Sequence, residues 1–202
     1  MVKNFKTIIL ISLLFFTFLL ISITSYSNSL SNSLSEHFLR LHIIANSNSK
    51  IDQELKLKIR DNILNYINST INKNSSKEET IVYIENNLES IKNICIETIN
   101  KEGFNYSVNL NIDNTFFPTK HYYNLSLPAG YYDALKIEIG NSNGENWWCC
   151  LYPPLCFIDI ADGKINTDYE SNLREDLSTE EFEIIRPSKP SIKFKFKLLE
   201  LF

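Results

Sequence analysis

The side chains best suited to chemistry gather in one stretch of this chain, Asn146–Phe157, which holds both tryptophans and three of the four cysteines. Cys149 and Cys156 lie seven residues apart with Pro153-Pro154 between them. In an exported protein, these two cysteines could close a short loop as a disulfide. The alternative is that all four cysteines are buried thiols that act as small hydrophobic side chains. A zinc site is disfavoured because no two-residue spacing of paired cysteines occurs.

The histidines are the candidate general bases of the chain: His37, His42 and His121. His42 lies on a predicted strand beside Arg40, and with a polar neighbour such as Asn46 it could serve an exported hydrolase acting on cell wall or peptide. We keep that activity as the alternative function. The chain has no nucleophile elbow, no glycine-rich phosphate loop and no zinc-protease motif. We therefore predict that the histidines are surface or packing residues, and we predict no catalytic residue, no cofactor and no metal site.

The two tryptophans have two interpretations. Adjacent residues of an extended chain point to opposite faces, so either Trp147 or Trp148 can enter the core while the other stays near the surface. The one near the surface would then be an anchor for a partner protein. Packing of both within the core is the alternative.

The first element that must position these side chains is a short strand. Within Leu39–Ile43, apolar residues alternate with Arg40 and His42, which is the pattern of a half-buried strand. We expect Leu39, Leu41 and Ile43 to share one face, and Arg40 and His42 the other.

Two amphipathic helices follow. A capping box of Ser49 with Asp52 opens the first, and one of Ser76 with Glu79 opens the second, for which Gly103 is a natural C-terminal cap. The apolar stripes have helical spacing: Leu55, Ile59, Ile63, Tyr66 or Ile67, and Ile71 in the first helix; Ile81, Ile84, Leu88, Ile91, Cys95 and Ile99 in the second. The short polar break between them predicts an antiparallel helical hairpin.

After Gly103 the apolar residues alternate, which predicts strands at 106–112, 116–123, 125–127 and 131–139. The fold class is therefore α+β, with the helical hairpin packed on a mostly antiparallel sheet. Near the C-terminus, Ile192–Leu198 alternates like a strand, and the adjoining Leu198–Leu201 could equally end a helix.

The N-terminus has the pattern of an export signal. Lys3 and Lys6 precede an uncharged stretch, Thr7–Tyr26, that reaches the ~20 residues needed to span a bilayer. Cleavage thus competes with retention as an anchor. We divide the chain into a signal peptide or membrane anchor (1–26), a Ser/Asn-rich linker (27–36), an α+β domain (37–160) and a polar C-terminal extension (161–202). The net charge of −4 gives no electrostatic footprint for nucleic acid.

Several motifs occur in order from about position 39 to 157. They are Leu39–Ser47, Asp52-Gln53, Leu55-Lys56, Arg60-Asp61, Phe117–Lys120, Leu127–Gly130, Tyr132, Ala134-Leu135, Gly140, Gly144, Asn146–Cys149 and Pro153–Phe157. In this order they resemble the stage II sporulation protein R family, and the Trp-Trp-Cys and Pro-Pro-Leu-Cys motifs are the most specific.

The resemblance implies a signalling role in endospore formation. Members of the family are made in the forespore and exported into the space between forespore and mother cell. There they activate a membrane-embedded aspartic protease of the mother-cell membrane, which processes pro-sigma-E. The implied partner is this protease, with membrane contact through the N-terminal segment if it is uncleaved. As partner-binding residues we predict Arg40, His42, Asn46, Trp147 and Trp148.

Overall fold

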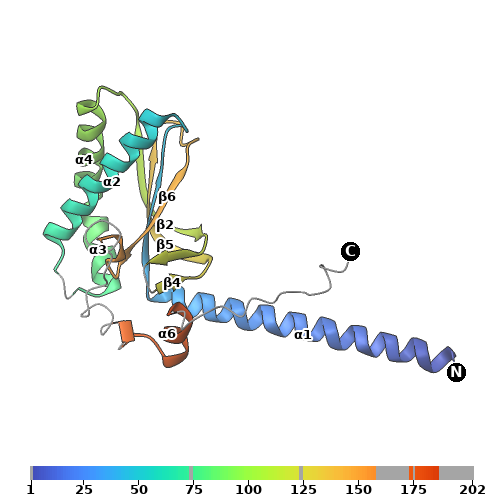
Figure 1. Ribbon diagram of the computed structural model, residues 1–202. Coiled ribbons are helices and arrows are strands. Elements are labelled where there is room, and N and C mark those ends of the chain that lie inside the picture. The colour runs from blue at the N-terminus through green and yellow to red at the C-terminus, as the bar shows by residue number, and fades with distance from the viewer. Residues whose placement is uncertain (1, 73–74, 123–124, 158–172, 175, 187–202) are drawn as a thin grey trace.

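The structure is a computed structural model that describes residues 2–72, 75–122, 125–157, 173–174 and 176–186 (Figure 1). Its helices and strands, in chain order, are α1 (Val2–Glu36), β1 (Leu39–Ile44), α2 (Lys50–Thr70), α3 (Lys77–Asn86), α4 (Leu88–Lys101), β2 (Val108–Phe117), β3 (Lys120–Tyr122), β4 (Leu125–Leu127), β5 (Gly130–Ile139), β6 (Asn146–Tyr152), the 3₁₀ helix η1 (Leu155–Phe157) and α6 (Thr179–Ile185).

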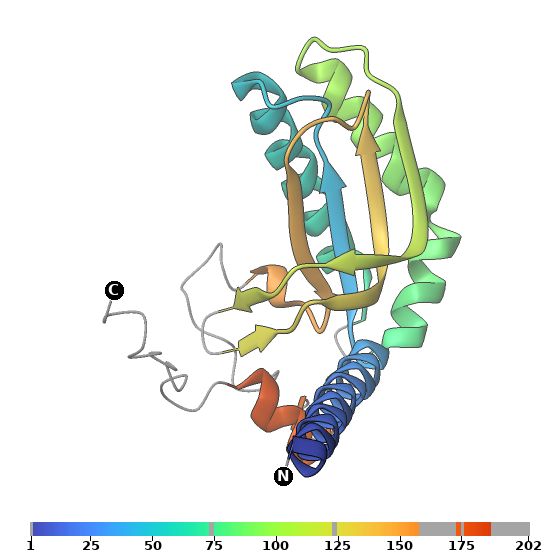
Figure 2. The same cartoon turned by 90° about the vertical axis from the view of Figure 1, so that its right-hand side faces the viewer.

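The centre of the fold is a four-stranded sheet in the order β2-β5-β1-β6. β1 runs parallel to β5, whereas the β1–β6 and β2–β5 pairs are antiparallel. Helices α2, α3 and α4 lie on one side of the sheet, and the small β3–β4 hairpin crosses part of the other (Figure 2). The predicted α+β class with a mostly antiparallel sheet is confirmed.

The half-buried character predicted for Leu39–Ile43 is wrong. β1 is an interior strand between β5 and β6, and the side chains on both of its faces are buried. Leu39, Leu41 and Ile43 are fully buried, but so is Arg40, and His42 is 4% exposed. The alternation is real, but it separates two buried faces rather than a buried face from a wet one.

The helical hairpin is confirmed, with one interruption. Ser49 caps α2 as predicted, and Gly103 ends α4 at a φ of 82°, where Phe104 N–H donates to the Ile99 carbonyl at 3.0 Å. The second predicted helix divides at Asn87, whose backbone (φ −117°, ψ 12°) is not helical. The side-chain amide of Asn87 donates to the Tyr83 carbonyl at 2.8 Å, and this hydrogen bond competes with continuation of the helix.

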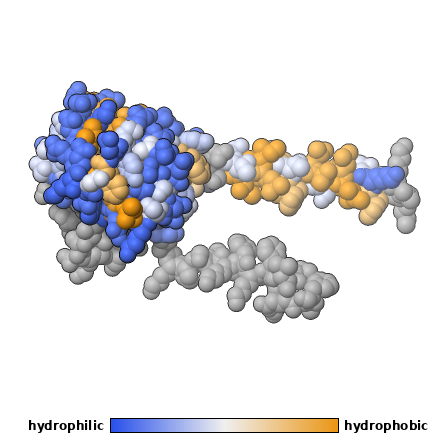
Figure 3. Space-filling view, turned by 90° about the horizontal axis from the view of Figure 1, so that it is seen from above, coloured by the Kyte–Doolittle hydropathy of each residue, from blue (hydrophilic) through white to orange (hydrophobic). Residues whose placement is uncertain are grey.

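Helix α1 carries the apolar N-terminal segment. Phe5–Tyr26 is long and apolar enough to cross a membrane, with a mean hydropathy of 2.6 and no part of it buried in the fold (Figure 3). The helix continues to Glu36, so residues 27–36, predicted as a linker, are helical. Leu34 and Phe38 are fully buried at its junction with the body. The boundary between segment and body stays a prediction, but the connection is not an irregular loop.

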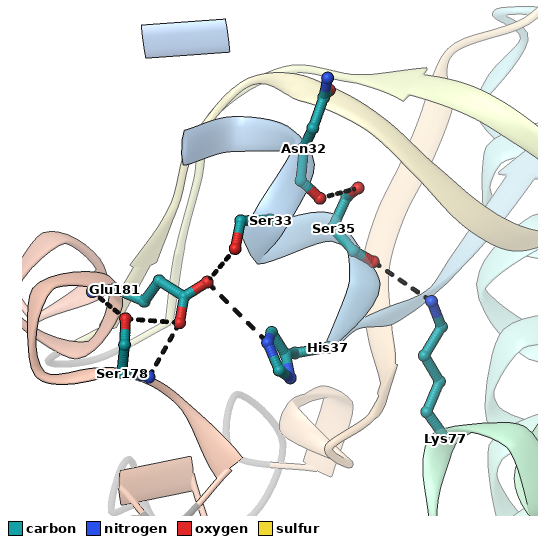
Figure 4. A network of polar contacts seen from close by, with 7 residues as sticks. All are labelled: Asn32, Ser33, Ser35, His37, Lys77, Ser178 and Glu181. Atoms are coloured by element: carbon teal, nitrogen blue, oxygen red, sulfur yellow. Dashed lines mark hydrogen bonds and ion pairs between the residues drawn. The ribbon is translucent and has the colours of Figure 1, made fainter. Parts of the chain in front are cut away.

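Part of the predicted C-terminal extension packs against this junction. Four of its apolar residues in the described range are buried, whereas Ile184 is exposed; the buried ones are Leu173, Leu177, Phe182 and Ile185. The Glu181 carboxylate of α6 accepts hydrogen bonds from Ser33 and Ser178 and lies 3.8 Å from His37 (Figure 4). α6 therefore clamps the C-terminal end of α1. The predictions for Ile192–Leu198 and Leu198–Leu201 lie outside the described residues.

Candidate partner-binding site

The site is built from a corner at which two turns interlock. The Asn46 amide donates to Asp52 Oδ2 at 2.9 Å, and its Oδ1 accepts from the backbone N–H of Asn141 at 2.9 Å. Gly140 allows this approach, because a Cβ there would lie 2.3 Å from Asn46 Oδ1. Asn46 was predicted to bind a partner, but the structure engages both ends of its amide inside the turn.

The same corner fixes the start of β6. Gly144 packs so closely that a Cβ would lie 2.3 Å from the Ser47 carbonyl oxygen. The Asn48 side chain accepts from the Glu145 N–H at 2.7 Å, and the Lys56 ammonium donates to the Glu145 carbonyl at 2.9 Å. Burial lowers the pKa of Lys56. These contacts position the strand that carries both tryptophans.

Arg40 lies at the centre of an aromatic cage. Its Nε donates to the Cys149 carbonyl at 3.0 Å and its Nη2 to the Tyr122 hydroxyl at 3.2 Å. The guanidinium carbon lies 4.4 Å from the ring centroid of Phe117 and 4.9 Å from that of Tyr132. Burial raises the pKa of Tyr132 to about 12, so its phenol stays neutral. Arg40 joins β1, β6 and the β3–β4 hairpin, and is too deeply buried to touch a partner in this conformation.

His42 is held between a tryptophan and an asparagine. Its ring stacks on Trp148 at a centroid distance of 3.8 Å and makes an edge contact with Phe117 at 6.0 Å. Nε2 donates to Asn146 Oδ1 at 2.7 Å, since an amide oxygen can only accept. Burial lowers the pKa of His42, so the ring is neutral at pH 7.

This geometry does not bring together the active site expected for the alternative hydrolase. Asn46, its predicted polar neighbour, is bound in the corner turn, and Arg40 points its donors at Cys149 and Tyr122. Within the described ranges, the His42 ring forms a hydrogen bond with Asn146, and no hydroxyl or thiol is hydrogen-bonded to it. What His42 does instead is orient Trp148.

The two tryptophans lie on opposite faces of β6, as the strand alternation predicts. Trp148 lies beside His42 on the face away from the helices, and its ring meets the Phe117 ring at 4.7 Å. Trp147 lies on the helix side, where the Arg60 guanidinium carbon is 4.3 Å from its ring centroid. Both are partly exposed, so neither packs wholly within the core. Among the described residues, the buried indole N–H of Trp147 has no acceptor.

Several residues of the site were not predicted. The rings of Phe117, Tyr122 and Tyr132 surround Arg40. Arg60 packs on Trp147, and its guanidinium pairs with the Asp61 carboxylate at 2.6 Å. All of them except Tyr122 occur in the motifs of the family resemblance, which was the available signal.

The cysteines divide between the two interpretations. Cys149 and Cys156 form a disulfide that ties β6 to η1. Cys95 and Cys150 are buried free thiols, and burial raises the pKa of each to about 12. Both thiols are therefore protonated and unreactive at neutral pH. Within the described residues, no group of three or more potential metal ligands occurs.

These features define a class: an α+β body on an N-terminal apolar helix of membrane-spanning length, with a rigidly positioned tryptophan pair on an edge strand. Residues 35–162 match the model of the family described as stage II sporulation protein R. The chain is 42% identical over 147 residues to stage II sporulation protein R of Bacillus subtilis (strain 168), an alignment that covers 73% of this chain and 66% of that protein. No solved structure matches. The chain belongs to the stage II sporulation protein R family.

Proposed function

We propose that this protein is an exported sporulation signal that activates a membrane-embedded aspartic protease of the mother-cell membrane, and so leads to processing of pro-sigma-E. The observation that carries the proposal is that the family match, residues 35–162, spans the whole body from β1 to η1. The apolar helix α1 supports export from the forespore into the space between the two membranes. We propose a role as protein ligand rather than enzyme.

The surface we propose for the protease contact is β6, the edge strand that carries Trp147 and Trp148. Partly exposed tryptophans held by packed neighbours are favoured as interface anchors, because little side-chain entropy is lost on binding. Here Arg60 holds Trp147 and His42 holds Trp148. Arg40 supports the strand through its hydrogen bond to the Cys149 carbonyl, and Asn46 fixes the turn that precedes it.

The test is co-expression with the candidate protease and its pro-sigma substrate in a host that does not sporulate. Processing of the substrate should require this protein. Processing that proceeds equally without it would contradict the proposal, as would purified body that hydrolyses peptidoglycan or peptide with a turnover abolished by His42→Ala. Sequencing the N-terminus of the mature protein decides between a cleaved signal and a retained anchor.

Trp147→Ala and Trp148→Ala test the contact surface. If each ring is an anchor, its truncation costs about 2 kcal/mol or more of binding free energy, or roughly a 30-fold loss of affinity. Processing at limiting protein should fall accordingly in variants whose thermal unfolding remains cooperative. Asn65→Ala, an exposed change on α2, is the matched control and should process normally. Normal processing by both folded tryptophan variants would show that β6 is not the contact.

A further inference from the structure

An exposed pair of aromatic residues lies away from the proposed protease contact. Phe116 of β2 and Tyr131 of β5 are cross-strand neighbours whose rings meet edge to face at 5.5 Å. Phe116 is 52% exposed and Tyr131 60%, whereas every other Phe, Tyr and Trp whose side chain the structure describes after α1 is buried or half-buried. The pair belongs to an arm (residues 116–122 and 125–131) that the ends of β2 and β5 form with the β3–β4 hairpin. Exposed apolar surface of this kind marks a contact with a membrane or with a protein.

The pair lies close to the C-terminal end of α1. The Lys77 ammonium joins this end to β5, because it donates to the Ser35 carbonyl at 3.2 Å and to the Asp133 carboxylate at 2.8 Å. Tyr131 is two residues before Asp133 in β5, so the two side chains lie on the same face of the strand. Figures 1 and 2 together show the arm projecting from the sheet on the side from which α1 leaves. The arm and α1 therefore extend from the body in the same direction.

Helix α6 shows how far the body extends along α1. The Tyr26 hydroxyl donates to the Glu180 carboxylate, and the Ser33 hydroxyl donates to the Glu181 carboxylate. Tyr26 is the last residue of the segment that is long and apolar enough to cross a membrane. The headgroup layer adds roughly 5–7 Å on each side of the hydrocarbon, which is about four residues of α1 at 1.5 Å each. With that segment in a bilayer, α6 brings the body to the level of the headgroups, and β4 of the arm packs against α6.

The chemistry of the pair fits the headgroup layer. A tyrosine places its ring among the lipids while its hydroxyl stays in water, which is why this residue is enriched at membrane interfaces. The Asp133 carboxylate nearby is neutralised by Lys77 and accepts a hydrogen bond from Asn114 at 3.3 Å, so it adds no unpaired charge beside the pair. We propose that the arm is a second membrane contact: with α1 in the bilayer, Phe116 and Tyr131 insert among the lipid headgroups and hold the body against the membrane surface.

Photocrosslinking to lipid tests this contact. The full-length chain is reconstituted into phosphatidylcholine vesicles that contain a radiolabelled lipid, with p-benzoylphenylalanine in place of Tyr131 or, in a second variant, of Phe116. Both positions are exposed, so the larger ring should leave the fold intact. Illumination should attach labelled lipid at both positions. The same probe at Phe15, within α1, is the positive control, and the probe at Val82, which is 54% exposed on α3, is the negative control.

A second readout changes the chemistry of the pair. With the probe at Phe116, Tyr131→Asp should lower the lipid yield several-fold, whereas Tyr131→Trp should preserve it, because tryptophan shares the preference of tyrosine for the interface. Lipid labelling at Phe15 without labelling at either arm position, or equal labelling at Val82, would overturn the proposal. Attachment to a second copy of the chain in place of lipid would overturn it too, as would a Phe15 probe that finds no lipid. The protease is absent from this experiment, so its failure leaves the proposed function untouched.

Discussion

The Cys149–Cys156 disulfide yields a prediction whose size follows from the chain. The two cysteines are separated by 7 positions, so reduction releases a short loop in the unfolded state. The chain-entropy relation then gives about 2 kcal/mol of lost stability. For a protein of this length, each kcal/mol corresponds to roughly 2–4 °C in the midpoint of thermal unfolding. Reduction should therefore lower that midpoint by roughly 4–8 °C.

Thermal unfolding with and without a reductant is the assay. The double variant Cys149→Ala/Cys156→Ala should unfold at the same temperature with and without reductant. Cys95→Ala, which removes a buried free thiol, should respond to the reductant as the wild type does. Alkylation of the denatured, unreduced protein should label Cys95 and Cys150 alone. The pairing would be refuted if the thermal midpoint of the wild type did not change with reductant, or if all four cysteines were labelled.

Two further predictions concern the corner turn and the α6 clamp. Gly140→Ala adds a Cβ at a φ of 56° against Asn46, so it should cost more than the ~1–2 kcal/mol of the left-handed backbone alone. Gly103→Ala, at a φ of 82° in open space, should cost that backbone term only, and equal urea midpoints for the two would contradict the interlock. Burial raises the pKa of Glu181, but hydrogen bonds from Ser178 and Ser33 outweigh it and hold the pKa below its ordinary value of 4.5. Its stabilising effect is therefore present above pH 4.5 and lost as pH falls through the lower folded pKa. The stability difference between wild type and Glu181→Gln should shrink over that acidic range, and a constant difference would count against the clamp.

Much of the fold follows from periodicity. The alternation after Gly103 and the helical stripes before it predict the α+β class, and strand alternation predicts that Trp147 and Trp148 separate to opposite faces. These are local properties, decided by neighbouring residues. The Asn87 break was missed because it depends on one side chain that bonds back to its own helix.

The Arg40 cage depends on contacts that no local pattern carries. Arg40 and Tyr122 are 82 positions apart, and they meet because β1 inserts between β5 and β6. An arginine that alternates with leucines has the pattern of an exposed residue until three aromatic rings are placed around it. The corner role of Asn46 was likewise hidden, because it depends on the missing Cβ of Gly140.

The unbroken course of α1 has a consequence for how the body can face its surroundings. The helix leaves the body on the side of the sheet away from α2, α3 and α4, as Figures 1 and 2 show together. From Tyr26 to Glu36 it adds about 15 Å of rigid rod at 1.5 Å per residue. If α1 is retained as a membrane anchor, Trp148 faces the side of the body from which α1 leaves, and Trp147 with Arg60 faces the opposite side. A larger loss of substrate processing in one of the variants Trp147→Ala and Trp148→Ala would show which side of the body contacts the protease. It would thus indicate whether the protein acts while anchored by α1 or after its release.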